Sequence, residues 1–183
     1  NVAGTQNILD AAAAVGVERV VHVSSIAALG LDPGRLADET SRLVFDSGAP
    51  YMDTKAASEE LVRRAFNERS IPAVIVRPGD VYGPGSEPWV ERPLRMLRRG
   101  LPLLVGGGRG LMAHCWIGNL VDALMAALAA PGVEGGIYQV TDGRHDTTYK
   151  DYFGRLAAAA GLSMPRVSMP GTTAVALGHV FEA

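Results

Sequence analysis

The sequence has little sulfur and few groups arranged to hold a metal ion. It contains one cysteine, Cys115, in 183 residues, which excludes an internal disulfide framework and a cysteine-based zinc site. The four histidines show no metal-ligand spacing, so we predict no metal site. We expect Cys115 to be a small buried side chain. Such sparse cysteine fits a reducing compartment, and we therefore expect a cytoplasmic protein.

Long apolar runs and an excess of basic charge are absent as well. No apolar stretch reaches the roughly 18–20 residues that a membrane-spanning helix needs, so no membrane partner is expected. The 17 lysines and arginines are balanced by 19 aspartates and glutamates, which gives a net charge of −2. That balance does not favour a nucleic-acid partner. With 48% hydrophobic residues, the chain is too apolar to be disordered, and its length suits one domain of middling size.

The sequence does contain an alternation of helical and strand-like segments. Helices are predicted over residues 1–15, 51–68, 90–99, 119–130 and 149–160, with a possible last helix over 172–183. Short apolar runs predict strands at 20–23, 73–76, 103–105 and 137–140. This alternation predicts an α/β fold, a doubly wound parallel sheet with helices on both faces. His22, on the first of these strands, is expected to be a core histidine with its hydrogen bonds satisfied.

One constellation suits proton transfer. Tyr51 and Lys55 are one helical turn apart, so their side chains can share a face. A phenol has a pKa of about 10, and a nearby ammonium lowers it toward neutral pH by stabilising the phenolate. Ser25, at the end of a predicted strand, can hydrogen-bond the oxygen that gains or loses the proton. The trio suits carbonyl/alcohol interconversion beside a nicotinamide. Taken alone, a tyrosine and a lysine at this spacing usually form a solvated surface pair.

These residues belong to an ordered set of four motifs: Asn1-Val2-Ala3-Gly4-Thr5, Val21-His22-Val23-Ser24-Ser25, Tyr51-x-x-x-Lys55, and Arg77-Pro78-Gly79-Asp80-Val81-Tyr82-Gly83-Pro84-Gly85. The set resembles the extended short-chain dehydrogenase/reductase family. That family includes nucleotide-sugar epimerases and dehydratases, 3β-hydroxysteroid dehydrogenases and dihydroflavonol-reductase-like enzymes. The resemblance covers nearly the whole chain and implies a Rossmann-type sheet.

The resemblance also implies a role for each matching residue. Tyr51 would be the catalytic acid/base, and Lys55 would lower its pKa and hydrogen-bond the nicotinamide ribose. Ser25 would bind the reacting oxygen, with Ser24 as the alternative. The cofactor would be NAD or NADP. The residues that would bind it are Asn1, Ser24, Tyr51, Lys55, Pro78, Gly79 and Val81.

Two departures from the family pattern concern the cofactor and the extent of the chain. The glycine-rich phosphate loop is absent, and Gly106-Gly107-Gly108 has the wrong spacing to replace it. The acidic or basic residue that selects NAD or NADP is absent as well. The chain is therefore a fragment, an incompletely determined chain, or a remnant that cannot bind dinucleotide. We favour the first two explanations and expect the first βαβ units of the fold to be missing. Residues 1–82 would form the latter part of the dinucleotide-binding domain. Residues 83–183 would contribute a smaller substrate lobe and returning strands.

A third departure concerns the substrate. Nucleotide-sugar members carry an arginine that grips the diphosphate, and alignment puts Met112 at that position and Trp116 at a following histidine. A methionine cannot make bidentate phosphate contacts, and Arg109 could substitute only if its loop is rearranged. We therefore expect a small apolar alcohol or ketone as substrate. The alternatives are a nucleotide-sugar epimerase or dehydratase and a non-catalytic dinucleotide-sensing protein. The resemblance also implies a possible homodimer through the Tyr51 helix.

Overall fold

The computed structural model describes residues 1–30, 37–165 and 167–173. The possible helix over 172–183 lies almost entirely outside the described residues. The chain divides into two units. The first consists of Asn1–Gly79 and Cys115–Thr141, and the second of Asp80–His114 and the chain from Asp142 onward.

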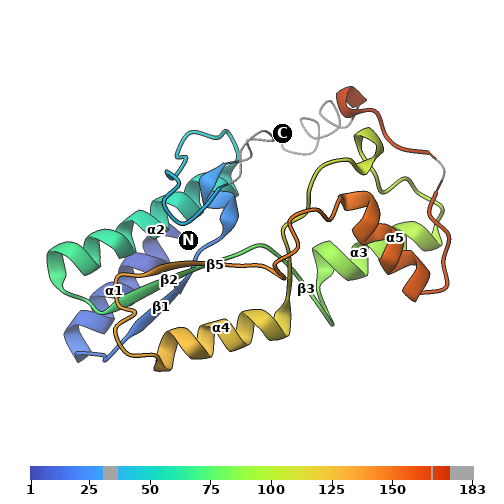
Figure 1. Cartoon of the computed structure of the whole chain (residues 1–183). Helices are drawn as coiled ribbons and strands as arrows, with labels where there is room; N and C mark the ends of the chain where they lie inside the picture. Colours follow the sequence, from blue (N-terminus) through green and yellow to red (C-terminus); the bar gives the residue numbers. More distant parts are fainter. Residues whose placement is uncertain (31–36, 166, 174–183) are drawn as a thin grey trace. The chain divides into compact units, whose positions relative to one another are not determined.

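The first unit is built on a three-stranded parallel sheet. Its strands are β1 (Val20–Val23), β2 (Ala73–Pro78) and β5 (Ile137–Val140), in the order β1-β2-β5. Val20 lies opposite Ala73, and Ile75 opposite Ile137. Figure 1 shows α1 (Val2–Val15) and α2 (Pro50–Arg69) on one face of the sheet and α4 (Ile117–Ala129) on the other. The predicted parallel sheet with helices on both faces is confirmed.

Alternation along β2 explains why both faces are covered. All six residues of this strand are buried, and successive side chains of a strand point to opposite faces. On one face Ala73 and Ile75 pack with Leu9 of α1 and with Val62 and Ala65 of α2. The first four residues of this strand, Ala73–Val76, therefore form a continuous apolar run, as is typical of strands buried on both faces.

The helix α2 carries the predicted site residues, and its first turn begins where the sequence favours a start. Pro50 occupies the first turn, where a missing N–H costs nothing, and Ala49 before it is extended. Asp53 in this turn accepts hydrogen bonds from the Ser47 hydroxyl (2.6 Å) and the Ser47 N–H (2.8 Å). These bonds hold the pKa of Asp53 below its usual value. The loop before α2 is thereby tied to its first turn.

The second unit holds shorter elements around a group of aromatic rings. They are β3 (Asp80–Tyr82), the π-helical turn Glu87–Glu91, α3 (Arg92–Arg98), the 3-10 turn Gly106–Gly108, the start of β4 (His114–Trp116) and α5 (Tyr149–Ala159). Tyr82 meets Tyr152 and His114 edge to face, with ring centroids 5.6 and 6.0 Å apart. His114 also contacts Asp142 (Nδ1 to Oδ2, 2.9 Å) and Thr147 (Nε2 to Oγ1, 3.0 Å).

One prediction in this region is wrong. Residues 103–105 form no strand, because only Val105 makes an isolated bridge, to Met169. The helix predicted near 90–99 is confirmed as α3, which begins at Arg92 and directly follows the π-helical turn Glu87–Glu91. The expectation for Cys115 is confirmed, because its side chain is fully buried.

Candidate active site

Tyr51 and Lys55 lie in the first two turns of α2. The Tyr51 side chain is 56% exposed. The Lys55 ammonium donates a hydrogen bond to the carbonyl oxygen of Val23, the last residue of β1 (3.0 Å). Partial burial lowers the pKa of Lys55 from its ordinary value. The helix thus places its lysine at the carboxyl end of the strand that leads into the two predicted serines.

Ser24 and Ser25 follow β1, and their hydroxyls have different partners. Ser24 Oγ donates to Oε2 of Glu59 at 2.7 Å. Ser25 Oγ accepts from the N–H of Ala27 at 3.1 Å and caps the short 3-10 helix Ile26–Leu29. This bond uses the Ser25 oxygen as acceptor and leaves its O–H as a donor. These bonds use the proton of the Ser24 hydroxyl but leave that of the Ser25 hydroxyl available to a reacting oxygen.

Asn1, the residue that precedes α1, is bonded to α2. Its side-chain amide donates to the hydroxyl oxygen of Thr54, the residue before Lys55 (3.0 Å). Asn1 and Lys55 also line one open groove of about 440 Å³ that runs along β1 between α1 and α2. The structure therefore gathers Asn1, Lys55 and the end of β1 in one place.

His22 lies on β1 beside this group. Burial, together with the charge of Lys55, lowers the pKa of His22 to about 4, while the opposite charge of Glu59 acts to raise it. The imidazole is therefore neutral at pH 7. Its Nε2 atom is buried and has no hydrogen-bond partner among the described residues. The expectation of a fully satisfied core histidine is wrong for this atom.

Two residues to which the sequence motifs assign no role adjoin this site, Glu59 and Arg77. Glu59 follows Lys55 by four residues on α2, and Arg77 is the fifth residue of β2. Both side chains are fully buried and paired, with Arg77 Nη2 at 2.6 Å from Glu59 Oε1. A signal was present, because an arginine inside an otherwise apolar strand needs a buried partner.

The remaining predicted residues do not all fall in the first unit. Pro78 is the buried last residue of β2, and Gly79 donates its N–H to the Val140 carbonyl oxygen at 3.0 Å. Val81 lies on β3 in the second unit. Met112, also in the second unit, is buried with 2% exposed, and its N–H donates to the Thr147 carbonyl oxygen.

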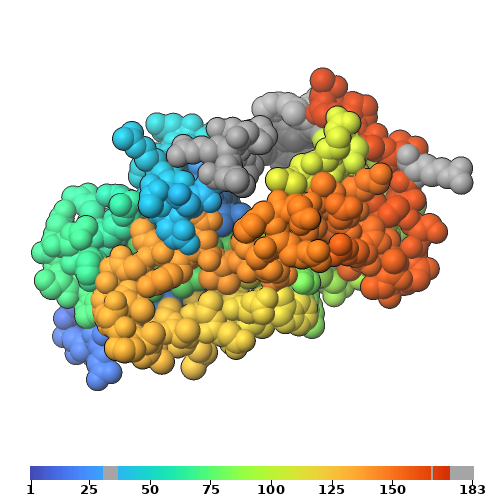
Figure 2. Space-filling view, in the orientation of Figure 1, coloured from blue at the N-terminus to red at the C-terminus, as the bar shows by residue number. Residues whose placement is uncertain are grey.

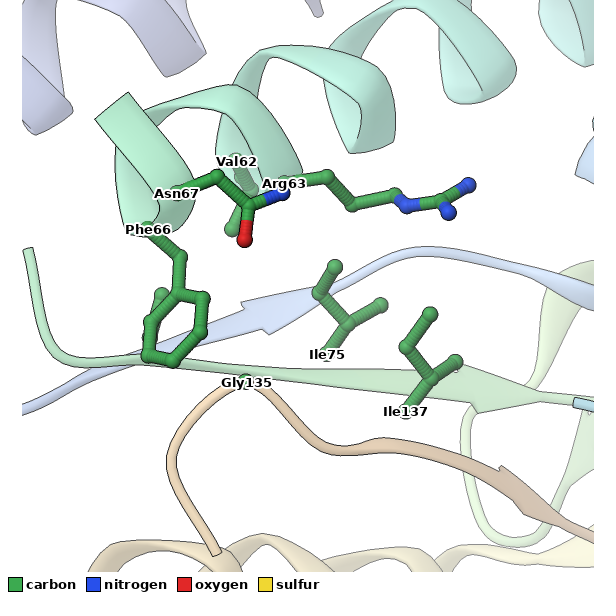
Figure 3. Close-up of a pocket in the computed structure, with 8 residues that line it drawn as sticks. Val62, Arg63, Phe66, Asn67, Ile75, Gly135 and Ile137 are labelled. Atoms are coloured by element: carbon green, nitrogen blue, oxygen red, sulfur yellow. The ribbon is translucent and has the colours of Figure 1, made fainter. Parts of the chain in front are cut away.

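A second hollow lies near the opposite end of α2. Figure 3 shows the Phe66 ring beside Gly135, with Ile75 and Ile137 extending from the sheet toward the helix. This pocket of about 230 Å³ is lined mostly by apolar side chains, with Arg63 and Asn67 at its rim. None of the predicted site residues is among those that line it.

The described residues contain neither a cluster of metal-binding side chains nor a membrane-spanning helix. Within residues 1–30, 37–165 and 167–173, no three histidine, cysteine, aspartate or glutamate side chains gather so as to hold a metal ion. None of the helices in this same part of the chain is long and apolar enough to cross a membrane.

Comparison with known proteins gives matches over most of the chain. The model of the NAD dependent epimerase/dehydratase family matches residues 1–141. The 2-alkyl-3-oxoalkanoate reductase of Stenotrophomonas maltophilia is 32% identical over all of this chain and 57% of its own length. The UDP-glucose 4-epimerase of Vibrio cholerae is 31% identical over 93% of this chain and 51% of its own length.

Solved structures give the same picture. The dTDP-glucose 4,6-dehydratase DesIV of Streptomyces venezuelae, with NAD bound, has a TM-score of 0.77 at 27% identity and covers 94% of this chain. The UDP-glucose 4-epimerase of Thermus thermophilus, in complex with NAD, has a TM-score of 0.74 at 28% identity and covers 91% of it. The chain spans a third to somewhat over half of the length of the curated relatives it matches.

Proposed function

The chain belongs to the NAD-dependent epimerase/dehydratase family, and we propose that the intact protein is an oxidoreductase of the extended short-chain type. It interconverts a secondary alcohol and a ketone on a small apolar substrate, with NAD or NADP as cofactor. One observation carries the proposal. Lys55, four residues after Tyr51, is hydrogen-bonded to the end of the strand that leads into Ser25.

The residues present fit a nicotinamide nucleotide at this place. The Lys55 ammonium has three donors, and its bond to the Val23 carbonyl oxygen uses one of them. The others suit the hydroxyl oxygens of a ribose. When bound, the nicotinamide ring supplies or accepts the hydride.

The proton on the substrate oxygen is handled by the side chains of the chain itself. In alcohol oxidation the Tyr51 phenolate accepts the hydroxyl proton, and in ketone reduction the Tyr51 phenol donates it. The positive charge of Lys55 stabilises the negative charge of the phenolate. The Ser25 O–H donates to the substrate oxygen and holds it near Tyr51, which is the orientation that proton transfer requires.

A second candidate is epimerisation or dehydration of a nucleotide sugar. It is favoured by the likeness to UDP-glucose 4-epimerase and dTDP-glucose 4,6-dehydratase. Met112 weighs against it, because a buried thioether cannot bind the diphosphate of such a substrate. Two assays of the intact protein distinguish these functions, one with NAD(P)H and ketones and the other with UDP- or TDP-sugars.

Substitution Tyr51→Phe tests the role of the phenol in either reaction. We expect kcat to fall by about 10²–10⁴, the range that a positioned acid/base contributes. The dinucleotide dissociation constant, measured by calorimetry, should stay within about twofold because the ring is retained. Tyr138→Phe is the matched control, since it removes another exposed phenol of the same unit. Full turnover in Tyr51→Phe contradicts the assignment, and dinucleotide binding without turnover of any carbonyl substrate by the wild type favours a sensing role.

A further inference from the structure

A fully buried ion pair joins α2 to β2 one helical turn beyond Lys55. Arg77 donates from Nε to Oε2 of Glu59 (3.0 Å) and from Nη2 to Oε1 (2.6 Å). Both side chains are 0% exposed. The Ser24 hydroxyl donates to the same carboxylate at 2.7 Å. Glu59 therefore accepts hydrogen bonds from residues of two neighbouring chain segments, β2 and the end of β1.

These contacts bind one face of α2 to consecutive residues at the end of β1. Lys55 and Glu59 are four residues apart and share a helix face. Lys55 is bonded to the carbonyl oxygen of Val23, and Glu59 to the hydroxyl of Ser24. The Ser24 N–H donates to the Val76 carbonyl oxygen of β2 at 2.8 Å. The position of the strand end is thus fixed against both the helix and the sheet, immediately before Ser25.

Stability alone does not account for such a pair. The free energy cost of removing both charges from water is about as large as the gain from their attraction. Replacing such a pair with apolar residues of similar volume therefore often leaves the stability of the fold unchanged or increases it. A bidentate arginine–carboxylate pair does supply a fixed geometry. The third arginine nitrogen, Nη1, donates to the carbonyl oxygen of Glu39 (3.3 Å), so the same guanidinium also holds the loop that precedes α2.

We propose that Glu59, oriented by Arg77, is a positioning residue that sets the Ser24–Ser25 strand end against Lys55 and Tyr51 of α2. This inference rests on the proposed function, because it concerns the geometry of that reaction. It also separates the two serines. Ser24 gives its proton to Glu59 and serves as a tether, and Ser25 is the one that meets the reacting oxygen.

The test uses the intact protein with both members of the pair exchanged together, as Glu59→Leu/Arg77→Met, so that no buried charge is left unpaired. We expect kcat for alcohol oxidation to fall at least about tenfold, since small misplacements of reacting groups cost one to two orders of magnitude. KM values for alcohol and dinucleotide should stay within about twofold. The midpoint of the rise of kcat with pH should move up by about half a unit or more, because Lys55 is held less firmly near the phenol. Unchanged kcat and an unchanged midpoint overturn the proposal.

Two further variants complete the test. If the double variant does not fold, Ser24→Ala tests the proposal instead, because it keeps the ion pair and removes only the hydrogen bond between Ser24 and Glu59. An unchanged kcat in Ser24→Ala overturns the proposal. A fall in kcat of about threefold or more, with the same upward shift of the pH midpoint, supports it. Glu134→Gln is the control, since it breaks the Arg19–Glu134 pair of the same unit and should leave kcat and its pH midpoint as in the wild type. An equal loss in this control assigns the effect to general loosening and overturns the proposal. A wild type inactive on every alcohol and ketone removes the proposed function itself, whereas an active wild type with unaffected variants removes only the positioning role.

Discussion

His22 shows how burial changes the protonation of a single residue. Its pKa in the folded chain is lowered from 6.5 to about 4, chiefly by burial and then by the charge of Lys55. Between these two pH values the unfolded chain binds a proton that the folded chain does not, so folding stability increases with pH in this window. The contribution is fully present above about pH 6.5 and is lost as the pH falls toward 4.

We therefore expect the free energy of unfolding to fall by about 2 kcal/mol between pH 7.5 and pH 5 through this group alone. His22→Gln should remove that part of the pH dependence, because glutamine does not titrate. Urea unfolding of both proteins at the two pH values measures the difference. His145→Gln is the control, since His145 is exposed. An identical pH dependence in wild type and His22→Gln would show that the histidine is not held neutral by the fold.

At the same scale, the sequence predicts some contacts and not others. The spacing of Tyr51 and Lys55 follows from one helix, so it can be read along the chain. The pairing of Glu59 with Arg77 depends on two elements that meet only in the fold. Hydropathy treats both as surface residues, and only the apolar neighbours of Arg77 hint otherwise. The orphaned Nε2 of His22 is a matter of atomic placement, which no residue pattern encodes.

At the scale of elements, the ends of α1 and α2 use the same backbone conformation with different residues. Gly16 ends α1 with φ 71 and ψ 51, and Ser70 ends α2 with φ 53 and ψ 30. Both angles lie in the left-handed region, which glycine adopts without cost and other residues adopt at a cost of about 1–2 kcal/mol. A Cβ on Gly16 would meet nothing within 4 Å, so the backbone alone decides the effect there.

We expect Gly16→Ala to lower the free energy of unfolding by about 1 kcal/mol and Ser70→Gly to raise it by up to about 1 kcal/mol. Thermal and urea unfolding of the two variants give the values. The substitutions are reciprocal, so they serve as controls for each other. A loss of stability in Ser70→Gly would indicate that the serine side chain contributes more than its backbone strain removes.

Element length largely decides which segments the sequence can predict. The sequence predicts the helices α2 and α5 and the strands β1, β2 and β5 close to their observed bounds, because the helices carry apolar residues at helical spacing and the strands are short apolar runs. β3 and β4 have three residues each, too few to show a period, and neither was predicted. The apolar run at 103–105 pairs with neighbouring backbone only through the isolated bridge of Val105 to Met169, which is too short to form a ladder.

At the scale of the whole molecule, neither unit is one continuous stretch of the chain. The chain leaves the first unit after Gly79, returns at Cys115 and leaves again after Thr141. The first crossing lies in the proline- and glycine-rich stretch 78–85, whereas no such stretch marks the return to the first unit at Cys115. Membership of a unit depends on contacts between distant segments, which local composition does not record.

The outer face of α4 bears on how the 183-residue chain behaves in solution. Leu120 and Ala127 of α4 are buried, whereas Val121, Met125 and Leu128 follow one another at helical spacing and are 47%, 59% and 50% exposed. The space-filling view shows α4 at the surface of the first unit (Figure 2). An exposed apolar stripe of this kind favours association, because covering it removes apolar area from water.

We expect the 183-residue chain on its own to self-associate as its concentration rises, and the double substitution Met125→Lys/Leu128→Lys to weaken that association by about tenfold or more. Sedimentation velocity over a range of concentrations measures both proteins. Asn67→Lys, at an exposed polar position of α2, separates the loss of apolar surface from the mere addition of charge. Association that persists in the double variant but weakens in Asn67→Lys would place the contact on α2 instead. A wild-type chain that stays monomeric throughout would show that the exposed stripe of α4 is too small to bring two copies together.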